Sequence, residues 1–384
     1  MALLACSDDG GGTADAGTQA AAARGGSSAA GASAPDRDAS ATAGTSAGGS
    51  GARDASAASG SGGRGGNNAG TGASAGAGAG GSAGSGPRDA GGDDARDASS
   101  PGPRDGSTAD CTVCTDYGAP MKLANIQVPA LNALSGIAVS ARHDATLWGH
   151  NDRNTTEIYA LGFDGKPRGR FALSGVTTTD LEDIAVGPCP AGSCVFVADI
   201  GDNASARSGI AILRAPEPEL PASADGAATP LPALERFAVQ YEDGAHNAEG
   251  ILVDPRGGAL YIVTKLPAGM ASSVYALPDP LVAGSTNMAR KVATLPVPRA
   301  GDSPATSTAA HPCGAGFLLR TNFELYEFRI DPAMPFTAAF AVTPVELTGG
   351  DEPQSEAVAY LPDGSGFVTS GEMNAAPIFR SQCK

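Results

Sequence analysis

The sequence predicts an all-β fold: a β-propeller of five four-stranded blades, preceded by a long disordered tether. A strand–turn–strand unit recurs after residue 130, and no window of a dozen residues in 120–384 keeps a helical spacing of apolar residues. Residues 7–110 contain no aromatic residue. A unit of ~50 residues that holds four short strands is typical of a propeller blade. Six blades and a two-sheet sandwich are the alternatives.

The repeated unit has four clear copies and one that is harder to see. The clear strand pairs are 135–139 with 146–148, 182–186 with 195–199, 249–254 with 260–263, and 356–360 with 367–368. The interval between Glu249 and Glu356 is long enough for two units, so we expect a further copy that begins near Thr306. Because Gly, Pro, Asp and Asn separate the two strands of each pair, tight turns connect them.

Further strands complete each blade. They are expected at 157–163 and 169–173, at 209–214 and 236–241, at 273–277 and 291–297, and at 324–330 and 338–347. The last unit has only 366–369 and 377–380 after its first strand, so its fourth strand must come from elsewhere. We expect residues 125–129 to supply it, because a ring closed by an N-terminal strand has no exposed edge.

Residues 7–110 are almost wholly Ala, Gly, Ser, Thr, Asp, Arg and Pro. Such a stretch buries too little apolar area to offset the entropy lost on ordering, so we expect a disordered linker. As a flexible coil it would span roughly 56 Å on average. The propeller domain is therefore expected to occupy residues 111–384.

Residues 1–6 resemble the end of a bacterial lipoprotein signal, in which a small residue precedes the lipidated cysteine, here Cys6. The basic region and apolar stretch of such a signal are missing, so either the start codon lies further upstream or the chain is trimmed. This resemblance predicts an exported protein that a lipid on Cys6 anchors to the bacterial envelope, at the outer membrane or cell surface. No other stretch approaches the ~18 apolar residues of a membrane span.

The chain is acidic, with 41 Asp and Glu against 25 Lys and Arg and a net charge of −16. This balance argues against nucleic acid as a partner and favours cations or basic partners.

The six cysteines after Cys6 are an even number, which in an exported chain predicts disulfides. Cys189 and Cys194 flank a short turn and are expected to pair. The pairing of the other four is open: Cys111 with Cys114, or cross-links that hold Cys383. A zinc site is disfavoured, because Cys111 and Cys114 have no second cysteine or histidine pair at a suitable spacing.

The segments 249–255 with 260–263, and 356–364, resemble the broad class of TolB-like and YVTN-type bacterial β-propellers, which includes the gluconolactonase-like ones. The resemblance covers most of residues 120–384 and implies the propeller fold. Residues 180–185 with 198–203 look like a signature of exported lipoprotein members of that class, and this signature carries no assigned activity.

In a propeller, the starts of the first strands and the ends of the second strands meet at one mouth. Glu182, Glu249 and Glu356 share one position of the repeat, which Ser135 and a residue near Ser307 occupy in the other two blades. The ends of the second strands carry Asn151 with Asp152, then Asp199, Lys265 and Arg320. The sequence therefore predicts an acidic mouth with a few amide and basic groups around it.

Converging carboxylates repel one another and need a cation, a shared proton or a basic neighbour. Calcium prefers oxygen ligands, so we expect a divalent cation, calcium first, at Glu182, Glu249, Glu356 and Asp199. Gluconolactonase-like propellers hold a divalent cation with Glu and Asn or Asp, and propeller phytases place Lys and Arg near calcium. The alternative is that the glutamates cap backbone amides or pair with Lys265 and Arg320.

Two functions follow from this mouth. In the first, a monomeric, membrane-anchored module binds a small ligand or an envelope protein, with Asn151, Lys265 and Arg320 contacting the ligand. In the second, a calcium-dependent hydrolase of the lactonase or phosphoesterase type uses Lys265 and Arg320 to stabilise an oxyanion or phosphate. The sequence fixes no reaction type, so the binding module is the favoured reading.

Overall fold

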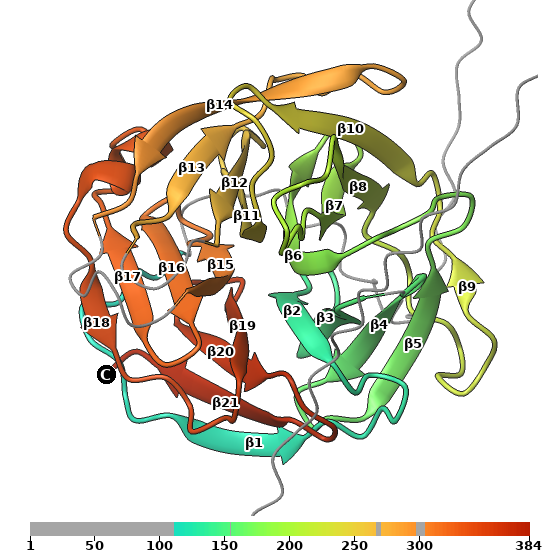
Figure 1. Cartoon of the computed structure of the whole chain (residues 1–384). Helices are drawn as coiled ribbons and strands as arrows, with labels where there is room; N and C mark the ends of the chain where they lie inside the picture. The colour runs from blue at the N-terminus through green and yellow to red at the C-terminus, as the bar shows by residue number, and fades with distance from the viewer. Residues whose placement is uncertain (1–110, 154, 266–269, 297–303) are drawn as a thin grey trace, which may run out of the picture. The chain divides into compact units, whose positions relative to one another are not determined.

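Five four-stranded blades stand around a central axis and form a β-propeller, as the sequence predicts (Figure 1). This computed structural model describes residues 111–153, 155–265, 270–296 and 304–384. The predicted lipid-anchor residue Cys6 and the predicted linker 7–110 lie outside the described residues. Among the described residues, no helix is long and apolar enough to cross a membrane.

Each blade has four antiparallel strands, listed here from the axis outward. Blade 1 consists of β2 (Leu134–Val139), β3 (Thr146–Asn151), β4 (Glu157–Gly162) and β5 (Pro167–Ala172), to which the short β9 (Thr229–Pro230) adds in parallel. Blade 2 consists of β6 (Leu181–Cys189), β7 (Gly192–Asp199), β8 (Ile210–Pro216) and β10 (Glu235–Tyr241). Blade 3 consists of β11 (Ala248–Val253), β12 (Leu260–Thr264), β13 (Ser273–Ala276) and β14 (Thr286–Thr294).

The last two blades follow the same plan. Blade 4 consists of β15 (Ala305–Ala310), β16 (Gly316–Thr321), β17 (Leu325–Arg329) and β18 (Val345–Leu347). Blade 5 consists of β19 (Ser355–Tyr360), β20 (Gly366–Gly371), β21 (Pro377–Gln382) and, from the N-terminal side, β1 (Met121–Asn125). Blade 4 confirms the copy of the repeat expected near Thr306, and β1 closes the ring as predicted.

The apolar core lies between neighbouring blades. Trp148 of β3 is fully buried in a cluster that includes Phe171 of blade 1 and Ile184 of blade 2. Its indole Nε1 donates a hydrogen bond to Glu217 Oε1 (2.8 Å), so the polar edge of the ring is also satisfied. Packing of this kind between sheets explains why every residue of the inner strands β2, β11 and β19 is buried.

Three strand predictions were wrong in position. The closing strand is Met121–Asn125 and not 125–129, because Ile126 and Val128 bury their side chains in the core between blades instead of extending the sheet. Residues expected as one strand at 338–347 form a 3-10 helix, Phe336–Ala341, and then β18. Phe336 and Phe340 lie four residues apart and pack on Tyr261, which favours a helical turn here.

The third error concerns β14, which begins at Thr286 and not at residue 291. Its first half pairs in parallel with β10, from Ala238 opposite Thr286 to Tyr241 opposite Ala289. Its second half pairs with β13 in the ordinary antiparallel way. Blades 2 and 3 are therefore joined into one eight-stranded sheet, which a repeat of separate blades does not predict.

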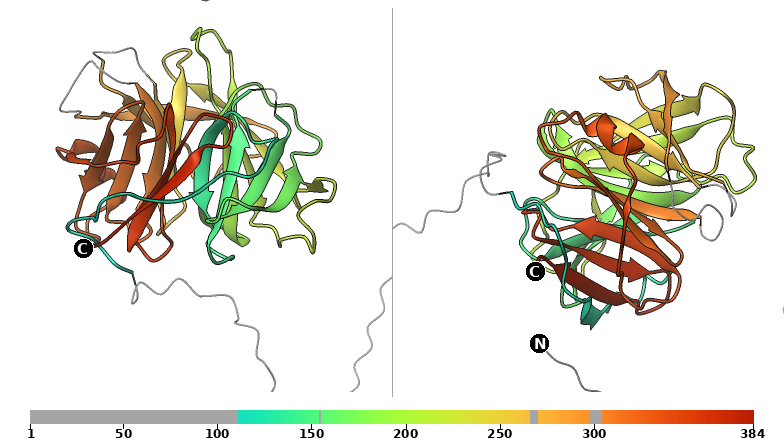
Figure 2. Two further views of the ribbon diagram at one scale, coloured as in Figure 1. Left: turned by 90° about the horizontal axis from the view of Figure 1, so that it is seen from below. Right: turned by 90° about the vertical axis from the view of Figure 1, so that its left-hand side faces the viewer.

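The structure contains three disulfides. Cys189 and Cys194 are bonded, as expected, across the β6–β7 hairpin. The other pairs are Cys111–Cys313 and Cys114–Cys383, so the alternative of Cys111 with Cys114 is not formed and the C-terminal Cys383 is held by a cross-link. Figure 2 shows the N-terminal segment and the C-terminus side by side at one end of the propeller axis.

Candidate binding site at the axial mouth

We call the end of the axis at which the five inner strands begin the mouth. Each inner strand starts with a β-bulge at the same place, where one extra residue interrupts the pairing with the second strand. The five extra residues are Ser135, Glu182, Glu249, Thr306 and Glu356. Bulges commonly re-aim a side chain next to a functional site. The three glutamates thus occupy equivalent positions, and the fourth blade contributes Thr306 where a residue near Ser307 was expected.

The two bulge residues that are not glutamates link neighbouring blades. Ser135 Oγ donates a hydrogen bond to the main-chain oxygen of Glu182 (2.8 Å), and Thr306 Oγ1 donates one to that of Ser355 (2.9 Å). Both hydroxyl residues are buried. These bonds fix the start of one inner strand against the next, so the bulges stand in a defined ring.

Three carboxyl groups converge at the junction of blades 1 and 2. Asp152 follows β3, Asp180 precedes β6, and Glu182 is the bulge residue of β6. One carboxylate oxygen from each lies within 4.8 Å of the others. We call these three residues the carboxylate trio. Its only basic contact among the ion pairs of the described residues is Arg153, 3.1 Å from Asp180 and 3.4 Å from Asp152, and that side chain is 56% exposed.

Gly201 of the β7–β8 loop and Asp199 at the end of β7 shape the trio. A Cβ atom at Gly201 would overlap Glu182 Oε1 and Asp180 Oδ2, so the absence of a side chain leaves room for both carboxylates. Asp199 Oδ1 accepts hydrogen bonds from the amides of Thr179 (3.1 Å) and Asp180 (2.9 Å) and pairs with Arg207 (3.0 Å). Asp199 therefore holds the segment that carries Asp180. Its Oδ1 is engaged by these contacts and does not belong to the trio.

The electrostatics of the trio favour a proton or a cation. Burial, followed by repulsion from Glu249, Asp180 and Asp152, raises the pKa of Glu182 to about 10. Burial, followed by repulsion from Asp180, raises the pKa of Asp152 to about 6. Asp152 Oδ1 is also buried without a hydrogen-bond partner. An added positive charge would therefore relieve repulsion and satisfy this oxygen at once.

The other two bulge glutamates have polar partners. Glu249 Oε1 accepts a hydrogen bond from Lys265 Nζ (2.8 Å), yet burial still raises the pKa of Glu249 to about 7. Glu356 Oε1 accepts a hydrogen bond from Asn322 Nδ2 (3.1 Å), and burial, followed by repulsion from Glu249, raises its pKa to about 8. The pairing that the sequence offered as an alternative to a metal thus applies to Glu249.

The other predicted ligand-contacting residues serve the framework. Asn151 Oδ1 accepts the amides of Asn132 and Ala133 (both 3.0 Å), and its Nδ2 donates to Ala130 O (2.7 Å). Arg320, 2% exposed, pairs with the buried Glu352 (2.9 Å). Lys265 is the one predicted basic residue that reaches the bulge glutamates, and Asn151 and Arg320 fasten loops beside the mouth.

Sequence reasoning placed Asp152 at the mouth without giving it a role, and it did not assign Asp180 or Asp183 to the site. Asp180 and Asp183 flank the Leu-Glu pair at the start of β6, and Asp152 follows Asn151, so each adjoins a residue that the repeat had singled out. Asp183 is fully buried and accepts hydrogen bonds from the amides of Ile184, Ile251 and Thr308 and from the Ser307 hydroxyl. Its role is to join inner strands, as a carboxylate with many donors does.

No family model matches the chain, and no curated protein matches it. Among solved structures, the chain is similar to a PQQ-bound aldose sugar dehydrogenase from Streptomyces coelicolor, with 13% identity, 70% of this chain and 98% of that chain covered, and a TM-score of 0.41. The chain is also similar to a soluble aldose sugar dehydrogenase from Escherichia coli in its apo form. The identity is 10%, the match covers 69% of this chain and 99% of that chain, and the TM-score is 0.39. At these values the likeness carries no conclusion about activity or cofactor.

Proposed function

We propose that the chain is an envelope-anchored propeller that binds ligands at its acidic mouth, where Asp152, Asp180 and Glu182 hold a calcium ion. The observation that carries this proposal is the convergence of three carboxylate oxygens within 4.8 Å of one another. Calcium bonds to oxygen at 2.3–2.6 Å, so two oxygens on one ion lie at most about 5 Å apart. The spacing of the trio fits that limit.

Three further features support a cation at this place. The donors are all carboxylate oxygens, which calcium prefers. Gly201 leaves the space between them free of a side chain. Asp152 Oδ1 is buried and has no other partner in the part of the chain that the structure describes.

Calcium takes six to eight oxygen ligands, and the trio supplies only some of them. The remaining positions would be available to water and to the oxygens of a ligand, such as a small polyhydroxylated or acidic molecule or a side chain of an envelope protein. Glu249, Glu356 and Lys265 lie around the trio and would set the charge that such a ligand meets.

Hydrolysis of a lactone or phosphoester finds less support. That reading needs Lys265 and Arg320 as stabilisers of negative charge, but Arg320 is buried against Glu352 and Lys265 is bonded to Glu249. We therefore assign no catalytic residue. From the resemblance to TolB-like and gluconolactonase-like propellers, the proposal takes only the binding of a divalent cation.

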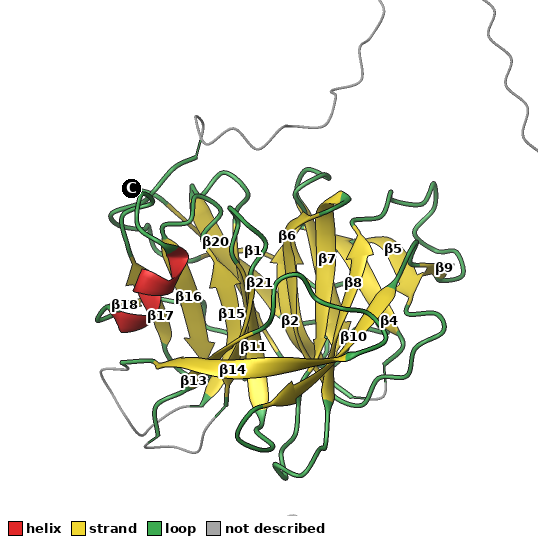
Figure 3. Cartoon of the chain, turned by 90° about the horizontal axis from the view of Figure 1, so that it is seen from above, coloured by secondary structure: helices red, strands yellow, loops and turns green. Residues whose placement is uncertain are grey.

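The lipid anchor at Cys6 is part of the proposal, and the described chain begins at the end of the domain opposite the mouth. Thr112 donates its amide to Asp363 O in the β19–β20 hairpin (2.7 Å), and Cys111 is bonded to Cys313 in the β15–β16 hairpin. Such hairpins follow the inner strands and lie at the end of the axis opposite the mouth (Figure 3). Labelling with palmitate, in a gene with its upstream sequence and in Cys6→Ser, tests the anchor.

Calorimetric titration of the metal-free chain with calcium tests the ion site. We expect binding in the wild type, with an increase in thermal stability that reaches about 2.7 kcal/mol at a hundredfold excess over Kd. Glu182→Gln should lose both effects while unfolding at the same or a higher temperature in chelator, because repulsion within the trio is relieved. Glu235→Gln, on the outer strand β10, is the control and should bind as the wild type does. Unchanged binding in Glu182→Gln would rule out the trio.

A further inference from the structure

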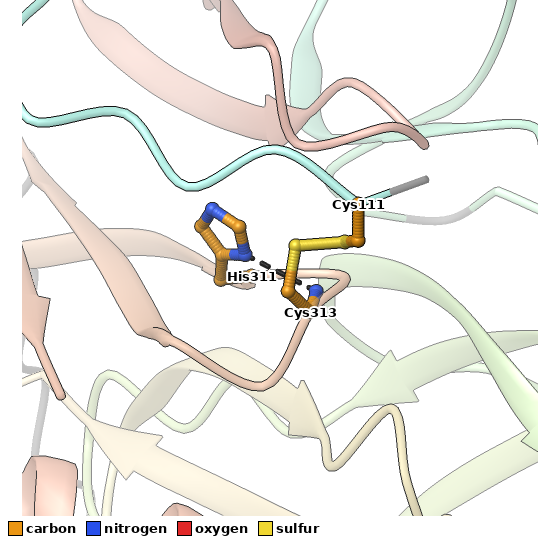
Figure 4. A group of neighbouring side chains, drawn as sticks. All are labelled: Cys111, His311 and Cys313. Carbon is orange, nitrogen blue, oxygen red and sulfur yellow. Dashed lines mark hydrogen bonds between the residues drawn. A yellow bond between two sulfur atoms is a disulfide. The ribbon is translucent and has the colours of Figure 1, made fainter. Parts of the chain in front are cut away.

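The disulfide between Cys111 and Cys313 has a histidine beside it. Cys313 and His311 lie in the β15–β16 hairpin, and Cys111 begins the described N-terminal segment. The two sulfur atoms and one ring nitrogen of His311 lie within 4.8 Å of one another. Figure 4 shows the imidazole next to the disulfide, with Nδ1 turned toward Cys313.

His311 is a buried side chain, 1% exposed, with one ring nitrogen near the disulfide. Nδ1 accepts a hydrogen bond from the amide of Cys313 (3.1 Å), which places the proton on Nε2. Coordination through Nδ1 uses this same tautomer, and the ion would take the Nδ1 lone pair in place of the Cys313 amide.

We propose that Cys111, His311 and Cys313 form a latent zinc site, which becomes available when the Cys111–Cys313 disulfide is reduced. A dithiol reductant breaks the bond: it supplies two electrons and two protons, becomes a disulfide itself, and leaves two cysteine thiols. Zinc then displaces both thiol protons and binds two thiolates and the imidazole. This site is independent of the calcium site proposed at the mouth.

The framework would keep the three ligands together after reduction. The amide of Thr112 remains bonded to Asp363 O (2.7 Å), and the backbone bridge between Tyr117 and Cys383 holds the same segment whether or not its cysteines are oxidised. Zinc bonds to sulfur at about 2.3 Å and to nitrogen at about 2.0 Å, so its ligand atoms lie about 3.3–3.8 Å apart. The sulfurs must separate on reduction until they lie about 3.8 Å apart, the spacing that a tetrahedral zinc ion requires.

The coordination would be completed from solvent. Cys111 is partly exposed, whereas Cys313 and His311 are buried, so one side of the cluster faces water. A water molecule can then take the fourth position of a tetrahedral zinc ion. Thiolates and imidazole select zinc or copper(I) over calcium, which prefers oxygen.

The same chain contains its own controls. Among the described residues, no histidine joins Cys114–Cys383 or Cys189–Cys194 in a comparable cluster. The disulfide state and the zinc state of Cys111 and Cys313 exclude one another, because each sulfur is either oxidised or bound to the ion. Zinc should therefore delay reoxidation of this pair and of no other.

Cobalt and zinc binding to the full chain tests the site. The oxidised protein is compared with protein reduced by a water-soluble phosphine, which takes the oxygen of water as the disulfide gains its hydrogens. We expect one cobalt ion per reduced chain, with a thiolate-to-cobalt charge-transfer band that the oxidised chain lacks. Cys313→Ser should abolish the band and His311→Ala should weaken zinc binding at least tenfold, whereas Cys194→Ser should leave both unchanged.

A second measurement needs no variant. Alkylation of the reduced wild-type chain, mapped by mass spectrometry, should show zinc protecting Cys111 and Cys313 while Cys189 and Cys194 react at their usual rate. Equal protection of all cysteines, or none, would overturn the proposal. So would a charge-transfer band that survives in Cys313→Ser and disappears in Cys194→Ser.

Discussion

The carboxylate of Asp183 on β6 accepts a hydrogen bond from the amide of Ile251 on β11 (2.9 Å), and the same oxygen accepts the amide of Thr308 on β15 (3.2 Å). One side chain therefore joins the inner strands of blades 2, 3 and 4. Gly136 of blade 1 lies against it, since a Cβ there would come 2.9 Å from Asp183 Cα. Asp183 thus lies where four of the five blades meet.

We expect Asp183→Ala to destabilise the domain strongly. Removal of the carboxylate leaves the amides of Ile251 and Thr308 buried without an acceptor, at about 1–3 kcal/mol for each. Asp183→Asn keeps one acceptor oxygen and should cost less. Urea unfolding followed by the fluorescence of Trp148, the single tryptophan, gives the free energies. Ser307→Ala, which removes one hydroxyl donor, is the control, and a loss as large as that of Asp183→Ala would contradict this account.

We expect the calcium-free domain to lose stability as the pH rises from 6.5 to 8. The pKa values of Glu249, Glu356 and Glu182 are raised to about 7, 8 and 10, so the folded state keeps protons that the unfolded state has already lost. Each such group lowers the free energy of unfolding by up to about 1.4 kcal/mol per pH unit. Burial lowers the pKa of His150 and His311 to about 4, and their opposite effect is complete below this window.

Denaturant midpoints in chelator at pH 6.5, 7.2 and 8 measure this slope. Calcium should flatten it, because the ion replaces the proton on the trio. A midpoint that rises with pH in chelator would show that these carboxyl groups are not protonated in the folded state.

We expect Gly201→Ala to impair cation binding more than folding. The added Cβ would overlap Glu182 Oε1 and Asp180 Oδ2, so both carboxylates must move apart. Calcium affinity should fall at least tenfold in calorimetric titration. Gly257→Ala is the matched control, because an added Cβ there meets nothing within 4 Å. Equal calcium affinities in the two variants would show that Gly201 does not shape the cation site.

We expect the disulfides Cys114–Cys383 and Cys189–Cys194 to contribute differently to the free energy of unfolding. Cys114–Cys383 spans 269 residues and Cys189–Cys194 spans five, and a longer closed loop restricts the unfolded chain more. The double variants should lose about 5 kcal/mol for Cys114→Ser/Cys383→Ser and about 2 kcal/mol for Cys189→Ser/Cys194→Ser. Urea unfolding of the oxidised proteins measures both, and the reverse order would contradict the argument from loop length.

Much of the fold could be predicted because the repeat is local. Alternating apolar residues and turn residues gave the five blades and the closing strand from the N-terminal side. The 3-10 helix at Phe336–Ala341 could not be recognised, because its two phenylalanines turn helical only through packing on Tyr261 of another blade. The parallel pairing of β10 with β14 depends on the meeting of two blades, which no single repeat encodes.

The site was predicted in part for the same reason. Glu182, Glu249 and Glu356 occupy equivalent positions because each follows the same point of the repeat. Asp152 and Asp180 lie in loops, and the position of Asp180 is set by hydrogen bonds to Asp199, so its approach to Glu182 has no signature in the repeat. The bulges that carry the glutamates could not be predicted either. Each bulge lies at the start of an inner strand, where one extra residue leaves the apolar pattern of the rest of the strand unchanged.

The disulfides at residues 111 and 114 also determine how the domain would bear mechanical load. A pull on the chain before Cys111 would otherwise act on β1, the outermost strand of blade 5, and could separate it from β21 one hydrogen bond at a time. Cys111–Cys313 and Cys114–Cys383 lie before β1 in the chain, so they transfer the force covalently to blade 4 and to the C-terminal end of blade 5. The strand that closes the ring is thus shielded from tension.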